Sequence, residues 1–297
     1  MPRVSPAVLR AVVRVALRPA LGPPVPWAAQ RAWMAAFSAT TRPPAGVATA
    51  REELGGRPAL RLTPAVGRHD GPAAVLLLHG GAYTTGSATT HRAFAGRLAA
   101  AAGAPVHLLE YRLAPEHPYP AALDDAAAAF AALAERAGGA DRTWLVGDSA
   151  GAGLAVALCA RLHEADRPGP AALGLVCPWL DTTLSAASVR RNRRREPLLR
   201  AAWLRRSAAA YRGGAAMPEA LWAPPDALPP VVLHGAGDDL LVDDADRLAA
   251  RLARAGRPCT YARFDGRPHD FHLFAGTTHD ADAAVDRLAR ELRAAAP

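Results

Sequence analysis

The segment Gly147-Asp148-Ser149-Ala150-Gly151 has the residue types and spacing of a serine nucleophile. It follows a short apolar run at 143–146 and precedes an Ala- and Leu-rich stretch that is typical of a helix. In this context G-x-S-x-G predicts a tight strand–turn–helix, where a larger side chain at either glycine would clash with its neighbours. Such a turn raises the Ser149 hydroxyl at the carboxyl edge of a sheet, above a helix N-terminus. The chemistry that this arrangement allows is acyl transfer.

A glycine-rich loop, His79-Gly80-Gly81-Ala82, directly follows the apolar run at 75–78. An acyl-transfer nucleophile needs backbone N–H donors for the oxyanion that develops on the substrate, and glycine lets the backbone approach closely. His79 fits a structural brace for this loop better than a base. A phosphate-binding loop is the rival interpretation, but the chain has no G-x-x-x-x-G-K-[S/T]. We expect the oxyanion hole to be formed by Gly80, Gly81, Ala82 and Ala150.

A carboxylate must orient the base, and in chains with this type of elbow the order is serine, acid, histidine. Asp238 follows the apolar run at 231–234 after a short loop, so we assign it as the acid. Asp239 is its close competitor. Three later aspartates, Asp243, Asp244 and Asp246, lie where a helix begins and fit capping and first-turn acids.

The base must come from the histidines after the last strand, which are His269, His272 and His279. The loop at 266–268 follows a strand that ends at Phe264 and so places His269 at the edge of the sheet. We therefore assign His269 as the base. His269 and His272 together also suggest a metal site, but no further ligands are evident, and we expect neither a metal nor a cofactor.

From about residue 73, short apolar runs alternate with longer helical patterns. This repetition predicts an α/β fold with a mostly parallel central sheet and helices on both faces. A less regular early pair of segments predicts an antiparallel hairpin around Gly55-Gly56. We expect strands at 75–78, 106–110, 143–146, 173–177, 231–234 and 260–264, helices at about 89–102, 121–137, 151–164, 243–255 and 280–294, and hairpin strands at about 47–54 and 58–63.

Two segments depart from this alternation, at about 1–45 and about 182–222. Both are helical or irregular in pattern and rich in large apolar side chains, such as Trp27 and Trp203. We expect a single domain, 1–297, in which these two segments form a helical cap over the sheet and border the substrate pocket. The residues that we expect to line this pocket are Trp33, Trp179, Leu180 and Phe271.

The composition of the 297 residues is that of a globular protein, with 51% hydrophobic and 21% charged residues. The net charge of +8 is carried by arginine without any lysine, and alanine is very abundant. This bias suggests a GC-rich genome rather than a basic binding face, so we expect no nucleic-acid partner. Cys159, Cys177 and Cys259 are too few and too widely spaced for a disulfide framework, which favours a reducing compartment.

The N-terminal stretch 4–18 is an amphipathic helical pattern in which Arg10, Arg14 and Arg18 share one face. The arginines interrupt the apolar stretch that a signal peptide requires, and no apolar run is long enough to span a membrane. We therefore expect a cytoplasmic protein without stable membrane insertion. The helix is expected to cover part of the protein with its apolar face, and attachment to a membrane surface is the alternative.

The densest charge run is at 190–195, where five arginines flank Asn192. We expect a solvated cap loop. Steering of anionic substrates is a second interpretation, and contact with nucleic acid or membrane is a third. Replacing the arginines and measuring salt sensitivity separates these interpretations.

Four motifs, in matching order, resemble those of the hormone-sensitive-lipase-like α/β-hydrolases of bacteria, the family IV carboxylesterases. They are HGGA at 79–82, YRLAPE at 111–116 running on to Pro120 and Asp124, GDSAG at 147–151, and the segments around Asp238 and His269. The match extends over essentially the whole chain from about residue 45. In this family the YRLAPE segment is structural, and the resemblance implies that Arg112 and Glu116 fix the loop near the active site.

Three positions depart from the family pattern. Ala82 stands at the usual third glycine of HGGG, which should be tolerated because only the backbone N–H is needed. Asp239 replaces the proline of the frequent Asp-Pro-Leu, which leaves the choice of acid open. Asp270 follows His269 where glycine is frequent, next to the base.

The resemblance implies a serine carboxylesterase that needs no metal or cofactor and acts on esters of short to medium acyl chains, or on lactones. Ser149 would form the acyl-enzyme, with His269 as base and Asp238 as its orienting acid. Amide or formamide hydrolysis is the main alternative activity. A non-catalytic small-molecule-binding role is a further alternative, since some similar proteins lack a working triad. The resemblance also allows a homodimer through an edge of the sheet.

Overall fold

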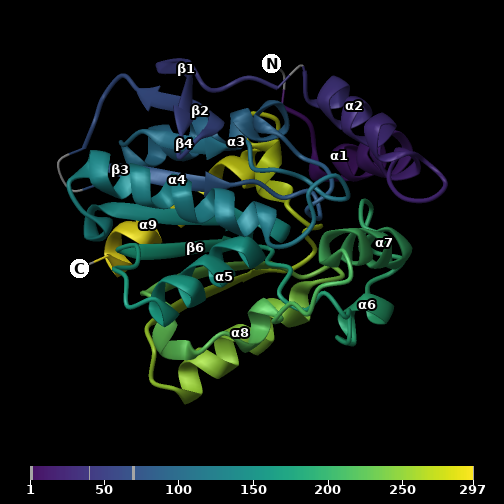
Figure 1. Ribbon diagram of the computed structural model, residues 1–297. Coiled ribbons are helices and arrows are strands. Elements are labelled where there is room, and N and C mark those ends of the chain that lie inside the picture. The colour runs from purple at the N-terminus through teal and green to yellow at the C-terminus, as the bar shows by residue number, and fades with distance from the viewer. Residues whose placement is uncertain (1–2, 40, 69–70, 297) are drawn as a thin grey trace.

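One sheet forms the centre of the computed structural model, which describes residues 3–39, 41–68 and 71–296 (Figure 1). Its strand order is β1-β2-β4-β3-β5-β6-β7-β8, and β2 runs antiparallel to both of its neighbours while the other pairs are parallel. The strands are β1 (Val47–Leu54), β2 (Arg57–Pro64), β3 (Ala74–Leu78), β4 (Val106–Leu109), β5 (Thr143–Asp148), β6 (Ala172–Val176), β7 (Val231–Ala236) and β8 (Cys259–Phe264).

The central strands are continuous apolar runs because both of their faces are covered. Every residue of β3, β5, β6 and β7 is buried. In the register, Leu78 at the end of β3 pairs with Gly147 of β5. The glycine-rich loop after β3 and the serine turn after β5 therefore leave the same edge of the sheet side by side.

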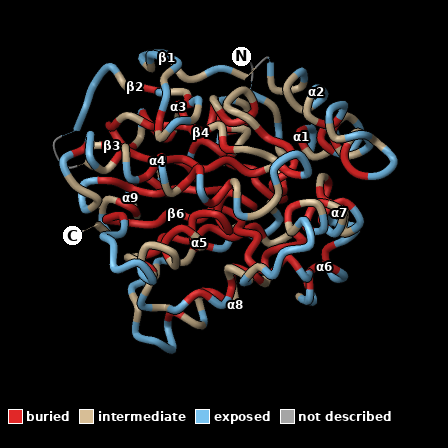
Figure 2. The backbone as a smooth tube through the Cα atoms, in the orientation of Figure 1, coloured by how far each residue is buried: buried red, intermediate tan, exposed pale blue. Residues whose placement is uncertain are grey.

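Helices cover both faces of the sheet and divide the core into two layers. On one face, side chains of α4, α5 and α8 pack with Leu76, Leu145 and Leu175. On the other face, α3 and α9 supply Phe94 and Leu288. Figure 2 shows that the most deeply buried backbone follows the strands between these layers. The helices are α3 (Ala88–Ala102), α4 (Ala121–Ala137), α5 (Ala150–Glu164), α8 (Val242–Arg254) and α9 (His279–Ala295).

The sequence-based expectation of a mostly parallel α/β fold is confirmed, with strand and helix ends that differ by one or two residues. The predicted hairpin is present as β1 and β2. The N-terminal helix is less regular than its pattern indicates: α1 (Pro6–Val12) continues as a π-helical turn, η1 (Val13–Leu17), and a 3₁₀ turn, η2 (Arg18–Ala20). Pro19 has no amide hydrogen to donate, so no α-helical hydrogen bond can reach the carbonyl of Val15.

The N-terminal helices lie on the same side of the molecule as α6 (Ser188–Arg191) and α7 (Ala201–Arg212) (Figure 1). The guanidinium of Arg206 on α7 stacks 4.3 Å from the ring of Trp27 on α2 (Trp27–Ser38). Leu9, Val13 and Leu17 form an apolar cluster that also contacts Leu198. We propose that these two parts of the chain together form the cap expected from the sequence.

No helix in the described part of the chain is both long and apolar enough to cross a membrane.

The α3–α9 layer yields a stability prediction. Leu98 on α3 is fully buried. Replacing Leu98 with alanine should lower the free energy of unfolding by about 2–5 kcal/mol, because the lost methyl groups leave a cavity that the helices fill only in part. Urea unfolding followed by circular dichroism measures this. Val66→Ala is the matched control, since Val66 is 78% exposed, and it should change stability little. Equal effects of the two substitutions would contradict this account of the core.

Candidate active site

Ser149 stands on the turn between β5 and α5, with a backbone φ of 51° in the left-handed region. A β-carbon at Gly147 would lie 2.3 Å from the carbonyl oxygen of Gly151, and one at Gly151 would lie 2.0 Å from the carbonyl oxygen of Leu78. Only glycine fits at these two positions, as the sequence pattern indicates. The turn therefore holds the Ser149 hydroxyl at the carboxyl end of β5, against the first turn of α5.

His269 is the histidine that the structure brings to Ser149. Its Nε2 lies 2.9 Å from the Ser149 hydroxyl oxygen, and both side chains are buried. The alternatives lie elsewhere: His272 contacts His234, with Nε2 and Nδ1 3.1 Å apart, and His279 begins α9. The arrangement predicted for Ser149 and His269 from the sequence is therefore the one that the geometry supports.

The carboxylate that contacts Nδ1 of His269 is that of Asp239, which corrects the choice of Asp238 from the sequence. His269 donates from Nδ1 to Oδ2 of Asp239 over 2.7 Å. Asp238 instead accepts a hydrogen bond from Arg10 on α1, at 2.9 Å from its Oδ2. The two carboxylates of this loop therefore face different partners, one the imidazole and the other the N-terminal helix.

The loop after β7 explains why the second aspartate reaches the imidazole. The amide of Asp239 donates to the carbonyl of Ala236 and closes a turn, while its Oδ1 accepts the amide of Leu241. The side-chain amide of Asn192 donates to the carbonyls of Gly237 and Asp239, at 3.0 and 2.7 Å. These contacts fix the Asp239 side chain towards the interior, where it is fully buried.

The environment of His269 favours its protonated form. Burial acts against a charged imidazole and is the largest single influence, but the carboxylates of Asp239 and Asp270 together outweigh it. They raise the pKa of His269 well above its ordinary value, because opposite charges at hydrogen-bond distance stabilise the imidazolium. An imidazolium held in this way is the species that a serine hydrolase forms when its base takes the serine proton.

The glycine-rich loop presents backbone amides next to Ser149, with one correction to the predicted donors. The amide of Gly80 donates to Oδ2 of Asp148 over 3.0 Å, so it is not free for an oxyanion. Within the described residues, the amides of Gly81 and Ala82 donate no hydrogen bond. Ala150 is the first residue of α5, where amides have no acceptor inside the helix. Gly81, Ala82 and Ala150 are therefore the available donors.

His79 braces this loop. Its ring is buried, Nδ1 donates to the carbonyl of Gly80 over 2.8 Å, and the ring stacks on Tyr111 with centroids 4.2 Å apart. Burial lowers the pKa of His79 to about 3, so it stays neutral. The Tyr111 hydroxyl donates to the His79 carbonyl over 2.6 Å. These contacts support the structural role expected for His79.

The YRLAPE segment ties the loop to two helices. Arg112 makes an ion pair with Asp125 of α4 at 2.7 Å. Glu116 pairs with Arg31 of α2, also at 2.7 Å, and Arg31 donates further to the carbonyls of Thr84 and Ala114. The segment therefore connects the N-terminal helices with the loop that carries the candidate oxyanion donors.

Comparisons with known proteins agree with this geometry. A family model described as an alpha/beta hydrolase fold matches residues 75–273. An acetyl-hydrolase of Streptomyces hygroscopicus is 38% identical over 232 residues, which are 77% of each chain. A crystal structure of an esterase from the bacterial hormone-sensitive lipase family has a TM-score of 0.90 and 31% identity over 99% of both chains. A hormone-sensitive lipase from a metagenome library gives a TM-score of 0.91 with 30% identity over 99% of both chains.

The chain belongs to the hormone-sensitive-lipase family of α/β-hydrolase esterases. The resemblance drawn from the four sequence motifs is thereby confirmed.

The departure of this esterase at Ala82 has a conformational cost. Ala82 has a φ of 54°, in the left-handed region where a β-carbon crowds the backbone. This conformation costs a non-glycine residue roughly 1–2 kcal/mol. The loop thus accommodates Ala82, as expected, but with a strained backbone at this residue.

Ala82→Gly should therefore stabilise this esterase by about 1 kcal/mol, which corresponds to a rise in Tm of about 2 °C for a domain of this size. Differential scanning calorimetry measures the shift. Ala250→Gly on the exposed face of α8 is the matched control, and it should lower stability by about 1 kcal/mol, since Ala250 lies inside the helix. A lower Tm for Ala82→Gly would show that the loop is not strained at this position.

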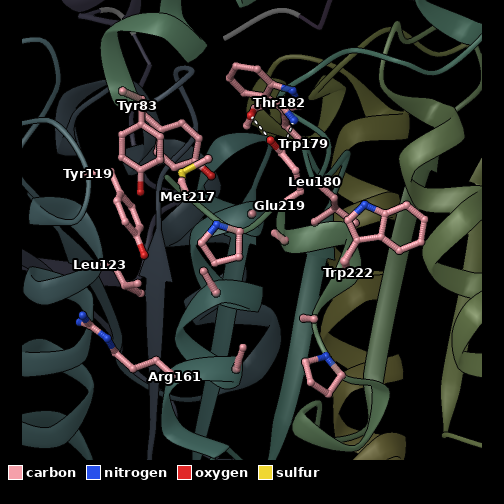
Figure 3. Close-up of a pocket in the computed structure, with 18 of the residues that line it drawn as sticks. Tyr83, Tyr119, Leu123, Arg161, Trp179, Leu180, Thr182, Met217, Glu219 and Trp222 are labelled. Atoms are coloured by element: carbon pink, nitrogen blue, oxygen red, sulfur yellow. Dashed lines mark hydrogen bonds between the residues drawn. The ribbon is translucent and has the colours of Figure 1, made fainter. Parts of the chain in front are cut away.

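A cavity of about 360 Å³ is lined by Tyr83, Trp179 and Gly153 of α5 (Figure 3). Trp179 donates its amide to the carbonyl of Ser149 over 3.0 Å, and Tyr83 stacks on Tyr211 with ring centroids 3.7 Å apart. The cavity continues along the face of α5 that carries Ala157. Aromatic rings thus form much of the wall, and Arg161 and Glu219 add polar groups to it (Figure 3).

Two of the four residues predicted to line the substrate pocket border this cavity. Trp179 and Leu180 line it. Phe271 packs instead against Phe264 in the α3–α9 core layer. Trp33 is 49% exposed on α2 and donates its ring N–H to the carbonyl of Ala16 over 2.9 Å.

Glu196 is a site residue that the sequence patterns did not single out. Its Oε2 accepts the amide of His269 over 2.9 Å and its Oε1 accepts the amide of Leu198 over 2.6 Å. Glu196 is fully buried, directly after the arginine run. The only available signal was one acid at the end of five arginines, which does not by itself indicate contact with the base.

The arginine run at 190–195 is solvated in its side chains and fixed in its backbone. Its arginine side chains are exposed, as expected, while Asn192 is buried. The carbonyl of Arg195 accepts Arg10 over 2.6 Å, and the carbonyl of Arg194 accepts Arg14 over 3.0 Å. The run therefore connects α1 to the acid-bearing loop.

Proposed function

We propose that this esterase hydrolyses esters of short to medium acyl chains through an acyl-enzyme on Ser149. The observation that carries the proposal is the continuous hydrogen-bond series from Ser149 to His269 to Asp239, at 2.9 and 2.7 Å. This series lies beside free amides of the glycine-rich loop. The name of the similar acetyl-hydrolase supports a small acyl group.

In the proposed mechanism His269 takes the proton of Ser149 as its oxygen attacks the ester carbonyl. Asp239 keeps the imidazole in the required tautomer and stabilises the imidazolium. The amides of Gly81, Ala82 and Ala150 bind the oxyanion. His269 then protonates the leaving alcohol, and water releases the acid from Ser149 by the same steps.

Replacing Ser149 with alanine should lower kcat for a short nitrophenyl ester by about five to six orders of magnitude. The reason is that no other side chain can form the acyl-enzyme. Steady-state hydrolysis of nitrophenyl acetate by purified wild type and variant measures this. The same panel should include lactones and anilides. A wild type that cleaves anilides but no ester or lactone would contradict the proposal, as would an active variant.

The two aspartates provide a sharper test. Asp239→Asn should lower kcat by about four orders of magnitude, because an amide at this position favours the wrong imidazole tautomer. Asp238→Asn is the matched control, one residue away and bonded to Arg10, and it should keep kcat within a few-fold of wild type. A larger loss of kcat in Asp238→Asn than in Asp239→Asn would show that Asp238 is the orienting acid.

We assign the cavity lined by Tyr83 and Trp179 to the acyl chain, because the amides of Trp179 and Gly153, which both line it, donate to the backbone carbonyl of Ser149. Its volume is in the range of a small-molecule site. Ala157 lies on its α5 wall, so Ala157→Phe should narrow it. The substitution should lower kcat/KM for a butyrate ester about ten-fold relative to the acetate, since two methylenes lose about 1.6 kcal/mol of burial.

The control for this test is Ala253→Phe on the exposed face of α8, which should leave the chain-length profile unchanged. A profile that is the same in Ala157→Phe and wild type would show that the acyl chain does not enter this cavity.

A further inference from the structure

Asp270, the residue directly after His269, places a second carboxylate on the base. Its Oδ2 lies 2.9 Å from His269 Nε2, the nitrogen that also faces Ser149. The side chain of Asp270 is only 7% exposed, and its Oδ1 is buried with no hydrogen-bond partner among the described residues. The backbone at Asp270 has a φ of 49°, in the left-handed region.

The two partners of Nε2, Ser149 and Asp270, require different protonation states at this nitrogen. To accept the proton of Ser149, Nε2 must offer a lone pair. To bind a carboxylate at 2.9 Å inside the protein, the Nε2–Oδ2 contact must hold a proton, whichever of the two atoms carries it. Two unprotonated acceptors at that distance would repel each other. The resting His269–Asp270 pair therefore retains one proton that catalysis must first remove.

The groups around the pair favour retention of this proton. Burial raises the pKa of Asp270 to about 7, and His269 opposes this rise while Asp148 and Asp239 add to it. The field around the pair is mainly acidic. The titratable groups that face it are Asp148 at the end of β5, Cys177 after β6, Glu196 of the cap, Asp239 after β7, His91 of α3 and His272 after Asp270.

We propose that Asp270 is a positioning residue that holds a proton on the Nε2 side of His269 and so sets the pH at which the base becomes able to accept the proton of Ser149. The inference rests on the proposed function. As the pH rises, the pair loses one proton to solvent, Nε2 becomes free, and the Ser149 hydroxyl donates to it. As the pH falls, the proton returns and hydrolysis stops. Asp270 acts through His269 and not on the ester.

The test is the pH dependence of kcat/KM, which reports the free enzyme. Asp270→Asn should move the acidic limb to lower pH by about one unit or more, because the removed carboxylate is an opposite charge in direct contact with the imidazolium. At a pH below both acidic limbs, kcat/KM can be expressed as a fraction of the plateau of the same protein. This fraction should then be about ten-fold higher in the variant than in wild type. Asparagine tolerates the left-handed backbone, so the turn should persist.

Asp270→Gly is the second variant, since glycine also adopts this backbone, and it should shift the limb in the same direction. Asp265→Asn is the matched control, because Asp265 is 87% exposed in the loop after β8, and its profile should equal that of wild type. A limb that stays in place in both Asp270 variants would overturn the proposal. Loss of activity at every pH in both variants would also overturn it.

A measurement without substrate separates this proposal from the esterase proposal. In protein with ¹⁵N-labelled histidine, NMR can follow the ring titration of His269, assigned by its absence in His269→Gln. The titration midpoint should fall in Asp270→Asn by the same amount as the acidic limb. An unchanged midpoint would contradict the role of Asp270, even if esters are cleaved. A shifted midpoint in a protein that cleaves no ester would support Asp270 and reject the proposed function.

Discussion

The active site depends on His269 using its two ring nitrogens for different partners. Nδ1 donates to Asp239 and Nε2 faces Ser149, and the three residues follow three different parallel strands. Parallel strands deliver their carboxyl ends to one edge, so the sheet brings these groups to the same edge. The turn at Ser149, with its positive φ, then places the hydroxyl within hydrogen-bond distance of the imidazole.

The two parts of the proposed cap are joined by arginine hydrogen bonds as well as by apolar packing. Arg10, Arg14 and Arg18 were expected on one helical face, and each donates to a backbone carbonyl between residues 194 and 196. The same segment ends in Glu196, which accepts the amide of His269. The N-terminal segment is thus connected to His269 through Glu196, which accepts hydrogen bonds from both Arg18 and His269. Arg10 also donates to Asp238, the aspartate that does not contact His269.

Much of the fold could be predicted because the central strands β3, β5, β6 and β7 are apolar runs buried on both faces, and several helices end at glycine, as α3, α4 and α7 do. Ser149 and His269 could be found for a similar reason, since a glycine pair and a post-strand loop fix their places. The sequence does not separate Asp238 from Asp239, because both follow the same strand. Their difference lies in Arg10, which is 228 residues away in sequence. Gly80 was misassigned because its partner, Asp148, belongs to another strand.

The most direct test of the catalytic centre is reaction with a fluorophosphonate, which traps an activated serine. Peptide mapping of the labelled protein should place the phosphonyl group on Ser149 alone, and His269→Ala should slow labelling by several orders of magnitude, because the serine loses its base. Label on another residue, or a labelling rate unchanged in His269→Ala, would contradict the assignment of Ser149 and His269.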